Sequence, residues 1–86
     1  DLLPPTAELR RGDGVRAVVL TAQGQRPLAR LRLLRDGQVW LERPLSSRAV
    51  RLTLDAAPGD RRLTAVVTDN LGLHSRPASL VMPTQD

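Results

Sequence analysis

Apolar and polar residues alternate along short stretches of the chain, and turn residues separate these stretches. In residues 29–35, Leu31 and Leu33 alternate with Arg30 and Arg32. Alternation with a period of two places the leucines on the buried face of a strand and the arginines in solvent. Patterns of this kind predict strands over residues 7–10, 15–22, 29–35, 39–41, 49–54, 62–68 and 78–82.

Two of these stretches predict more than a strand. Residues 15–22 are apolar on both faces, which predicts a central strand covered on two sides. Asp36 and Gly37 lie directly between two apolar stretches. The Asp-Gly pair favours a type I′ turn, because both central residues of that turn need positive φ. Residues 29–41 are therefore predicted to form a hairpin, which Pro44 ends.

Strands spaced roughly ten residues apart are typical of a sandwich. We therefore predict an all-β fold of about seven antiparallel strands in two sheets. Gly12 and Gly14 flank a further turn, where we expect them to supply positive φ. The predicted core consists of Leu20, Leu31, Leu33, Val50, Leu52, Leu63, Ala65, Val67 and Leu80.

One stretch carries a resemblance to a known family. In residues 63–77, an apolar alternation ends in the spacing A-x-x-x-D-x-x-G-x-x-S, formed by Ala65, Asp69, Gly72 and Ser75. This resembles the penultimate strand of bacterial immunoglobulin-like and fibronectin type III-like modules. The D-G hairpin and a P-G turn at residues 58–59 are similar to the same modules.

The resemblance covers most of the chain, from about Pro5 to Met82. It implies an immunoglobulin-like sandwich over residues 5–82, with a linker at 1–4 and a tail or linker at 83–86. The chain departs from the antibody pattern because it has no cysteine, and because its single tryptophan follows the D-G turn. These two departures exclude a true antibody-type domain.

The resemblance also implies a function. Such modules occur in bacterial multidomain proteins, so we expect a non-catalytic accessory domain that mediates protein interaction or spacing. The expected partner is a neighbouring domain or another protein chain, and the excised domain is expected to be a monomer. The chain opens with Asp1, from which we expect excision or processing from a longer protein. The resemblance favours the periplasm or the cell exterior, but the compartment stays open.

Composition excludes several classes of site. The absence of cysteine excludes disulfides and thiolate metal sites, and the single histidine, His74, excludes the usual zinc sites. No cofactor is expected. No apolar run approaches the ~20 residues that span a bilayer. All 13 basic residues are arginine and lysine is absent, a bias that a GC-rich genome explains without a nucleic-acid partner.

Three motifs suggest chemistry but have simpler explanations. Arg11-Gly12-Asp13 spells an integrin-recognition tripeptide, yet it also forms a plain turn. Asp69, His74 and Ser75 are the residue types of a hydrolase triad, but adjacent residues of an extended segment point to opposite faces. We therefore expect Asp69 to accept local backbone hydrogen bonds instead, and we expect no enzyme. Calcium ligation by Asp13, Asp60, Asp69 and Asn70 is also rejected in favour of solvated turns.

The candidate binding residues are basic or aromatic. Arg30 and Arg32 share a strand face, and we expect Arg51, or Arg48, to join them from another strand. Trp40 is expected to be core or half-exposed packing, yet interfaces favour tryptophan beside arginine. If a binding surface exists, we expect it around Trp40. The alternative function is the binding of a polyanion, either nucleic acid or acidic glycan, through the arginine-lined face.

Overall fold

The computed structural model describes residues 3–57 and 59–82, and within them it contains strands and turns but no helix. Every predicted strand is present; the end of β4 lies three residues beyond the prediction, and every other strand end lies within two residues of its predicted position. The seven strands are β1 (Thr6–Arg11), β2 (Ala17–Gln23), β3 (Leu28–Arg35), β4 (Gln38–Pro44), β5 (Ala49–Asp55), β6 (Arg62–Asp69) and β7 (Ala78–Val81).

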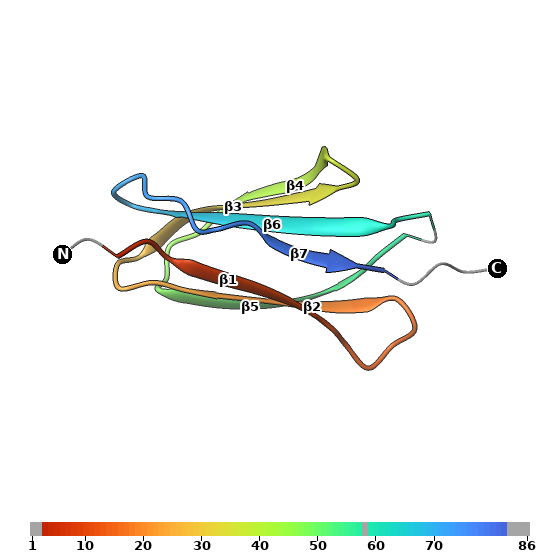
Figure 1. The fold of residues 1–86 in the computed structure, drawn as a ribbon. Coiled ribbons are helices and arrows are strands. Elements are labelled where there is room, and N and C mark those ends of the chain that lie inside the picture. The colour runs from red at the N-terminus through yellow and green to blue at the C-terminus, as the bar shows by residue number, and fades with distance from the viewer. Residues whose placement is uncertain (1–2, 58, 83–86) are drawn as a thin grey trace.

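The strands form two antiparallel sheets that face each other (Figure 1). One sheet has the order β1-β2-β5, and the other has the order β4-β3-β6-β7. The molecule is elongated, with extents of 47 × 24 × 20 Å. The chain enters β1 at one end of the long axis and leaves β7 at the other (Figure 1). The predicted all-β sandwich of seven antiparallel strands is confirmed.

Leucine and valine side chains fill the space between the sheets. Six of the nine predicted core residues are buried, and Val50, Leu52 and Leu80 are only half-buried, because β5 and β7 are edge strands that the opposite sheet covers incompletely. The prediction also missed several members of the core. These are Leu9, Val18, Ala22, Leu28, Ala56 and Met82.

Strand β2 is central in its sheet, but it is covered on one face only. Val18 and Leu20 are buried, whereas Val19 and Thr21 on the other face are half-buried. The prediction of a strand covered on two sides is therefore wrong. Val15, which was assigned to this strand, lies before it and is 73% exposed. The apolar pattern of residues 15–22 overstated burial because the β1–β2 turn covers the outer face of β2 only at Ala17, which is 7% exposed, and leaves Val19 and Thr21 half-buried.

The hairpin between β3 and β4 has the predicted turn. Asp36 has φ 51° and Gly37 has φ 85°, the two positive values that a type I′ turn requires. The Asp36 carboxylate accepts hydrogen bonds from the N–H groups of Arg61 and Arg62. The hairpin tip is thereby fixed to the start of β6.

The turn between β1 and β2 differs from the prediction. Neither Gly12 nor Gly14 has positive φ. A Cβ atom at Gly12 would lie 3.0 Å from the Cβ of Ala17, and one at Gly14 would lie 3.3 Å from the same atom. Glycine is needed here for close approach, not for a left-handed backbone. The predicted linker at 1–4 and tail at 83–86 lie partly or wholly outside the described residues, so these boundaries stay predictions.

Candidate functional site

The connection between β6 and β7 is organised around the buried carboxylate of Asp69. Its Oδ1 accepts hydrogen bonds from the backbone N–H groups of Leu71 and Leu73, both at 2.9 Å. Its Oδ2 accepts two from Arg26, at 2.8 Å from Nη2 and 3.1 Å from Nε. Arg26 also donates to the carbonyl oxygen of Leu3 at 2.6 Å. Through Arg26, the Asp69 carboxylate therefore connects this loop to the segment that leads into β1.

These contacts determine the protonation of Asp69. Burial raises its pKa, but the N–H of Leu73, the guanidinium of Arg26 and the N–H of Leu71 lower it by more. The pKa of Asp69 therefore lies below its ordinary value, because hydrogen bonds and a nearby cation favour the ionised form. The predicted role in local backbone hydrogen bonds is confirmed.

The residues of the rejected triad have separate partners. The Ser75 hydroxyl is buried and accepts a hydrogen bond from the N–H of Val67 at 3.0 Å. The exposed His74 lies with Nδ1 2.8 Å from the hydroxyl of Thr68. Among the described residues, no hydrogen bond joins Ser75 to His74 or His74 to Asp69. The geometry of a nucleophile, its base and an orienting carboxylate is not formed.

The connection between β5 and β6 is organised around a guanidinium instead. Arg16 donates to three backbone carbonyls, those of Ala56, Ala57 and Asp60. The Asp60 carboxylate has fewer contacts. It accepts one hydrogen bond from the N–H of Ala57 at 2.8 Å, and its Oδ1 is 3.8 Å from Nε of Arg35.

The acidic residues considered for calcium do not converge. Asp60 precedes β6 and Asp69 ends it, so the two carboxylates lie at opposite ends of that strand. Both are buried, at 7% and 2% exposed. The prediction that they are solvated turn residues is therefore wrong for these two and correct for Asp13 and Asn70, which are exposed. The part of the chain that the structure describes contains no cluster of three or more potential metal ligands.

The arginines predicted to form one face belong to two. Arg30 and Arg32 point outward from β3 in the four-stranded sheet, where Leu31 and Leu33 point inward. Arg51 points outward from β5, which belongs to the three-stranded sheet. The outer faces of a sandwich are opposite each other, so the prediction that Arg51 joins Arg30 and Arg32 is wrong. Arg48 precedes β5, and its carbonyl accepts a hydrogen bond from Gly24.

Trp40 lies away from both arginine faces. The β3–β4 register shifts after Leu33, so that Val39 and Leu41 have partners and Trp40 is the extra residue of a bulge. Its half-buried side chain packs against the core, and the guanidinium carbon of Arg35 lies 5.6 Å from the ring centroid. The expected packing role of Trp40 agrees with these contacts, and the arginine beside its ring is Arg35.

A shallow hollow lies on the outer face of the four-stranded sheet, between β3 and β6. It encloses about 200 Å³ and is lined by Arg30, Arg32, Leu34, Val66, Thr68 and His74. Sequence alternation placed Arg30, Arg32, Val66 and Thr68 outward, but His74 was not expected beside them. A bridge between Thr68 and His74 brings that histidine to the edge of the hollow.

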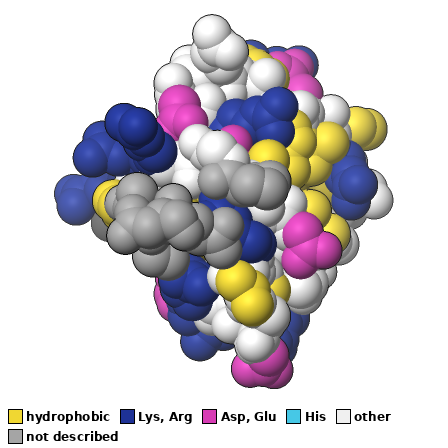
Figure 2. Space-filling model, turned by 90° about the vertical axis from the view of Figure 1, so that its right-hand side faces the viewer, with side chains coloured by type: hydrophobic (Ala, Val, Ile, Leu, Met, Phe, Trp, Pro, Cys, Tyr) yellow, Lys and Arg dark blue, Asp and Glu magenta, His cyan; other side chains and the backbone are white. Residues whose placement is uncertain are grey.

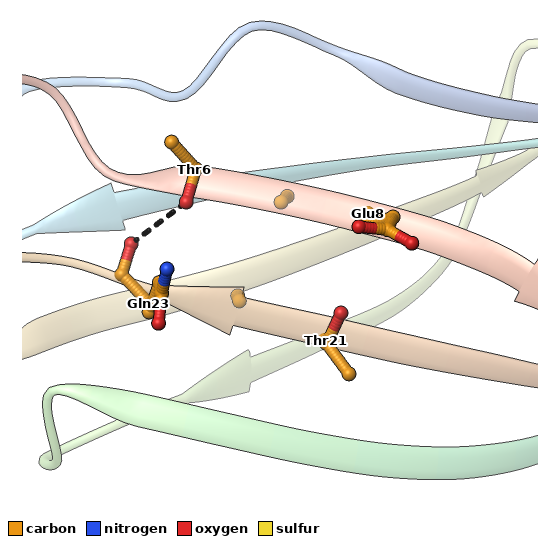
Figure 3. Close-up of a pocket in the computed structure, with 6 residues that line it drawn as sticks. Thr6, Glu8, Thr21 and Gln23 are labelled. Atoms are coloured by element: carbon orange, nitrogen blue, oxygen red, sulfur yellow. Dashed lines mark hydrogen bonds between the residues drawn. The ribbon is translucent and has the colours of Figure 1, made fainter.

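Two other hollows belong to the three-stranded sheet. Thr6 and Glu8 on β1 and Thr21 and Gln23 on β2 surround a space of about 210 Å³ (Figure 3). Its hydroxyls and amide offer polar contacts around one carboxylate, that of Glu8. The second hollow, of about 360 Å³, lies between the β1–β2 turn and the outer face of β5.

The second hollow includes the Arg-Gly-Asp tripeptide. Arg11 ends β1, and its guanidinium donates to the carbonyl of Val15 at 2.7 Å within the same turn. Asp13 is exposed. Figure 2 views the end of the molecule with this turn and shows basic side chains interspersed with acidic and apolar ones. The tripeptide thus has a structural role in its own turn.

The chain has no match among protein-family models, and no curated protein matches it. Within residues 3–57 and 59–82 no helix has the length and apolarity to cross a membrane. The functional interpretation therefore depends on the geometry of the two sandwich ends and the two outer faces.

Proposed function

We propose that this chain is a non-catalytic accessory module of a larger bacterial protein, which spaces or docks its neighbours. The path of the chain carries the proposal. The strands run along a molecule 47 Å long, and the chain enters and leaves at opposite ends (Figure 1). A module with this path holds the segments on either side of it apart.

The order of the strands supports the resemblance to immunoglobulin-like and fibronectin type III-like modules. Lettered in chain order, β1, β2 and β5 correspond to strands A, B and E of such sandwiches. In the same scheme β4, β3, β6 and β7 correspond to C′, C, F and G. Immunoglobulin-like sandwiches place A, B and E in one sheet and C, F and G in the other, and variable-type domains add C′ to the second sheet. Strand D of the constant type, which belongs to the first sheet, has no counterpart among the described strands.

The hydrogen bonds at the two ends support a spacing role. Asp69 with Arg26 fixes the β6–β7 connection, and Arg16 fixes the β5–β6 connection. Loops held by buried hydrogen bonds keep one conformation better than loops held by solvent-exposed contacts. The module can therefore transmit a fixed distance and orientation between the segments that it joins.

A domain replacement in the full-length protein tests the proposal. We expect deletion of residues 5–82 to leave kcat on a small soluble substrate, if the protein is an enzyme, within a few-fold, while assembly, localisation or large-substrate binding changes. Insertion of an unrelated sandwich of similar length restores these properties if spacing alone is required. A fall in kcat of about a thousandfold in a stable, folded deletion variant contradicts a non-catalytic role.

The alternative function is polyanion binding. It was based on a face shared by Arg30, Arg32 and Arg51, and it now depends on Arg30 and Arg32 alone. Proteins that bind single-stranded nucleic acid combine a basic groove with stacking aromatic side chains. The single aromatic residue of this chain, Trp40, packs against the core, which favours the protein-interaction function.

A further inference from the structure

We propose that the outer face of the four-stranded sheet, centred on the hollow between β3 and β6, binds an acidic segment of a protein partner. The proposal rests on the docking role given above and names the chemistry of the partner. Three features support it: the geometry around Arg30, the charges of the two outer faces, and the apolar residues of the hollow.

Arg30 is the central side chain of the proposed surface. It lies between Pro44 on β4 and Thr68 on β6, and it lines the hollow of about 200 Å³. No hydrogen bond or ion pair of the Arg30 side chain occurs among the described residues. A guanidinium in this state offers its paired N–H groups to a carboxylate, which can accept two parallel hydrogen bonds.

Two neighbours extend the site on either side of Arg30. Arg32 lines the same hollow while its Nε lies 3.0 Å from Glu42. Arg32 is therefore held in place, and its charge is partly compensated. On the other side, His74 bonds to the Thr68 hydroxyl through Nδ1. Within residues 3–57 and 59–82, the hollow thus combines an arginine without an ion pair, an arginine paired with Glu42 and a histidine.

The two outer faces differ in charge. The outward charged side chains of the four-stranded sheet are Arg30, Arg32, Arg62 and Glu42. Three positive charges and one negative charge give this face a net +2. The outward charged side chains of the three-stranded sheet are Glu8, Arg10, Arg51 and Asp55. Two positive and two negative charges give zero, so an acidic partner is attracted to the four-stranded face.

The apolar part of the hollow favours a protein segment over nucleic acid. Leu34 and Val66 are half-buried and lie beside the arginines. Protein interfaces combine arginine with apolar contact area at their centre, whereas single-stranded nucleic acid needs aromatic rings on which to stack. A segment in which acidic residues alternate with aliphatic ones fits the hollow.

Two double variants of the 86-residue chain test the proposal. The first, Arg30→Gln with Arg32→Gln, removes one free and one ion-paired arginine from the proposed face. The control, Arg10→Gln with Arg51→Gln, does the same on the other face, where Arg10 lies 3.4 Å from Glu8 and Arg51 has no ion pair among the described residues. Both variants reduce the net charge equally, and all four side chains are exposed.

The probe is a fluorescent peptide of glutamates interspersed with leucines, and its anisotropy reports binding. We expect the first variant to weaken binding about three- to tenfold and the control to change it less than about twofold. In ¹H–¹⁵N spectra the peptide should perturb residues of β3 and β6. Equal weakening by both variants, perturbation of the three-stranded face, or no binding by the unmodified chain overturns the proposal.

A single-stranded oligothymidine of equal charge distinguishes the two partner classes. If it binds the same face more tightly than the peptide, an acidic protein partner is wrong and the polyanion alternative is supported. Melting temperatures of both variants within a few degrees of the unmodified chain exclude unfolding as the cause of lost binding. The domain replacement tests spacing separately, because an unrelated sandwich without these arginines can restore spacing but not docking.

Discussion

The loops at the two ends of the sandwich are held by side chains of opposite charge. At the β6–β7 end, a carboxylate is the centre, and Asp69 accepts hydrogen bonds from two backbone N–H groups and from Arg26. At the β5–β6 end, a guanidinium is the centre, and Arg16 donates to three backbone carbonyls. Each centre satisfies the backbone groups that its own loop leaves without partners.

The two ends depend on different side chains. The Asp60 carboxylate at the Arg16 end accepts one hydrogen bond, from the N–H of Ala57, and has only a long contact of 3.8 Å with Arg35. Asp60 precedes β6 and Asp69 ends it, and both aspartates are buried. Only Asp69 is the centre of a hydrogen-bond network. Burial alone does not measure the importance of a charged residue.

The largest expected effect is that of Asp69→Ala. The substitution leaves the N–H groups of Leu71 and Leu73 without an acceptor and leaves the half-buried Arg26 without its counterion. We expect the melting temperature to fall by about 10 °C or more. Thermal unfolding followed by circular dichroism measures this. A smaller fall for Asp69→Ala than for Asp60→Ala contradicts the comparison.

The Arg16 end should show the opposite dependence. Arg16→Ala removes three hydrogen bonds to carbonyls, whereas Asp60→Ala removes one hydrogen bond from Ala57. We expect Arg16→Ala to cost about 2 kcal/mol and Asp60→Ala about 1 kcal/mol. Urea unfolding gives both free energies. If Asp60→Ala costs more, the carboxylate and not the guanidinium organises this loop.

The sequence predicted the strands and the local backbone contacts of Asp69, but not the arginines that act at the two ends, for a physical reason. Alternation is a local property, so Leu31 and Leu33 reveal the inner face of β3 without knowledge of the rest of the chain. Arg26 and Asp69 are 43 positions apart, and Arg16 and Ala57 are 41 apart. No local pattern connects such partners, so both arginines were indistinguishable from the other eleven.

The candidate binding residues show the same limit. Alternation correctly placed Arg30, Arg32 and Arg51 outward, but it does not specify which sheet a strand joins. The pairing of β5 with β2 separated Arg51 from the others. The packing role expected of Trp40 agrees with its contacts. The bulge that holds Trp40 was not predicted, because the turn signal of Asp36-Gly37 does not reveal a bulge beyond it.

The two ends should also respond differently to acid. The folded pKa of Asp69 lies below its ordinary value, so its contribution to stability is present above about pH 4 and is lost as the pH falls through the folded pKa. The partners of Arg16 are backbone carbonyls, which acid does not protonate, so the Arg16 centre is not lost with the Asp69 centre. We expect Asp69→Asn to reduce the loss of stability as the pH falls below about 4, and Arg16→Ala to leave that loss unchanged. Urea unfolding at several pH values provides the test. If the unfolding free energy of Asp69→Asn falls with decreasing pH as steeply as that of the unmodified chain, the expectation is contradicted.

The smallest expected effect separates the two loops by their glycines. Gly72, in the Asp69 loop, has φ +88°, and its N–H donates to the carbonyl of Asp69 at 3.0 Å. Gly59, in the Arg16 loop, has no positive φ, and a Cβ atom at either glycine would meet no atom within 4 Å. Space is therefore equal at the two positions, and only the backbone conformation differs.

Gly72→Ala should accordingly cost about 1 kcal/mol, because an alanine is strained in the left-handed region. Gly59→Ala should be neutral or stabilise the fold by up to about 1 kcal/mol, since it restricts the unfolded chain without strain in the folded one. The two substitutions are matched in chemistry and in free space. The difference between their unfolding free energies therefore measures the cost of placing an alanine in the left-handed backbone conformation. Equal effects would mean that the Asp69 loop accepts another backbone conformation, and the carboxylate would then hold that loop less tightly than its four hydrogen bonds indicate.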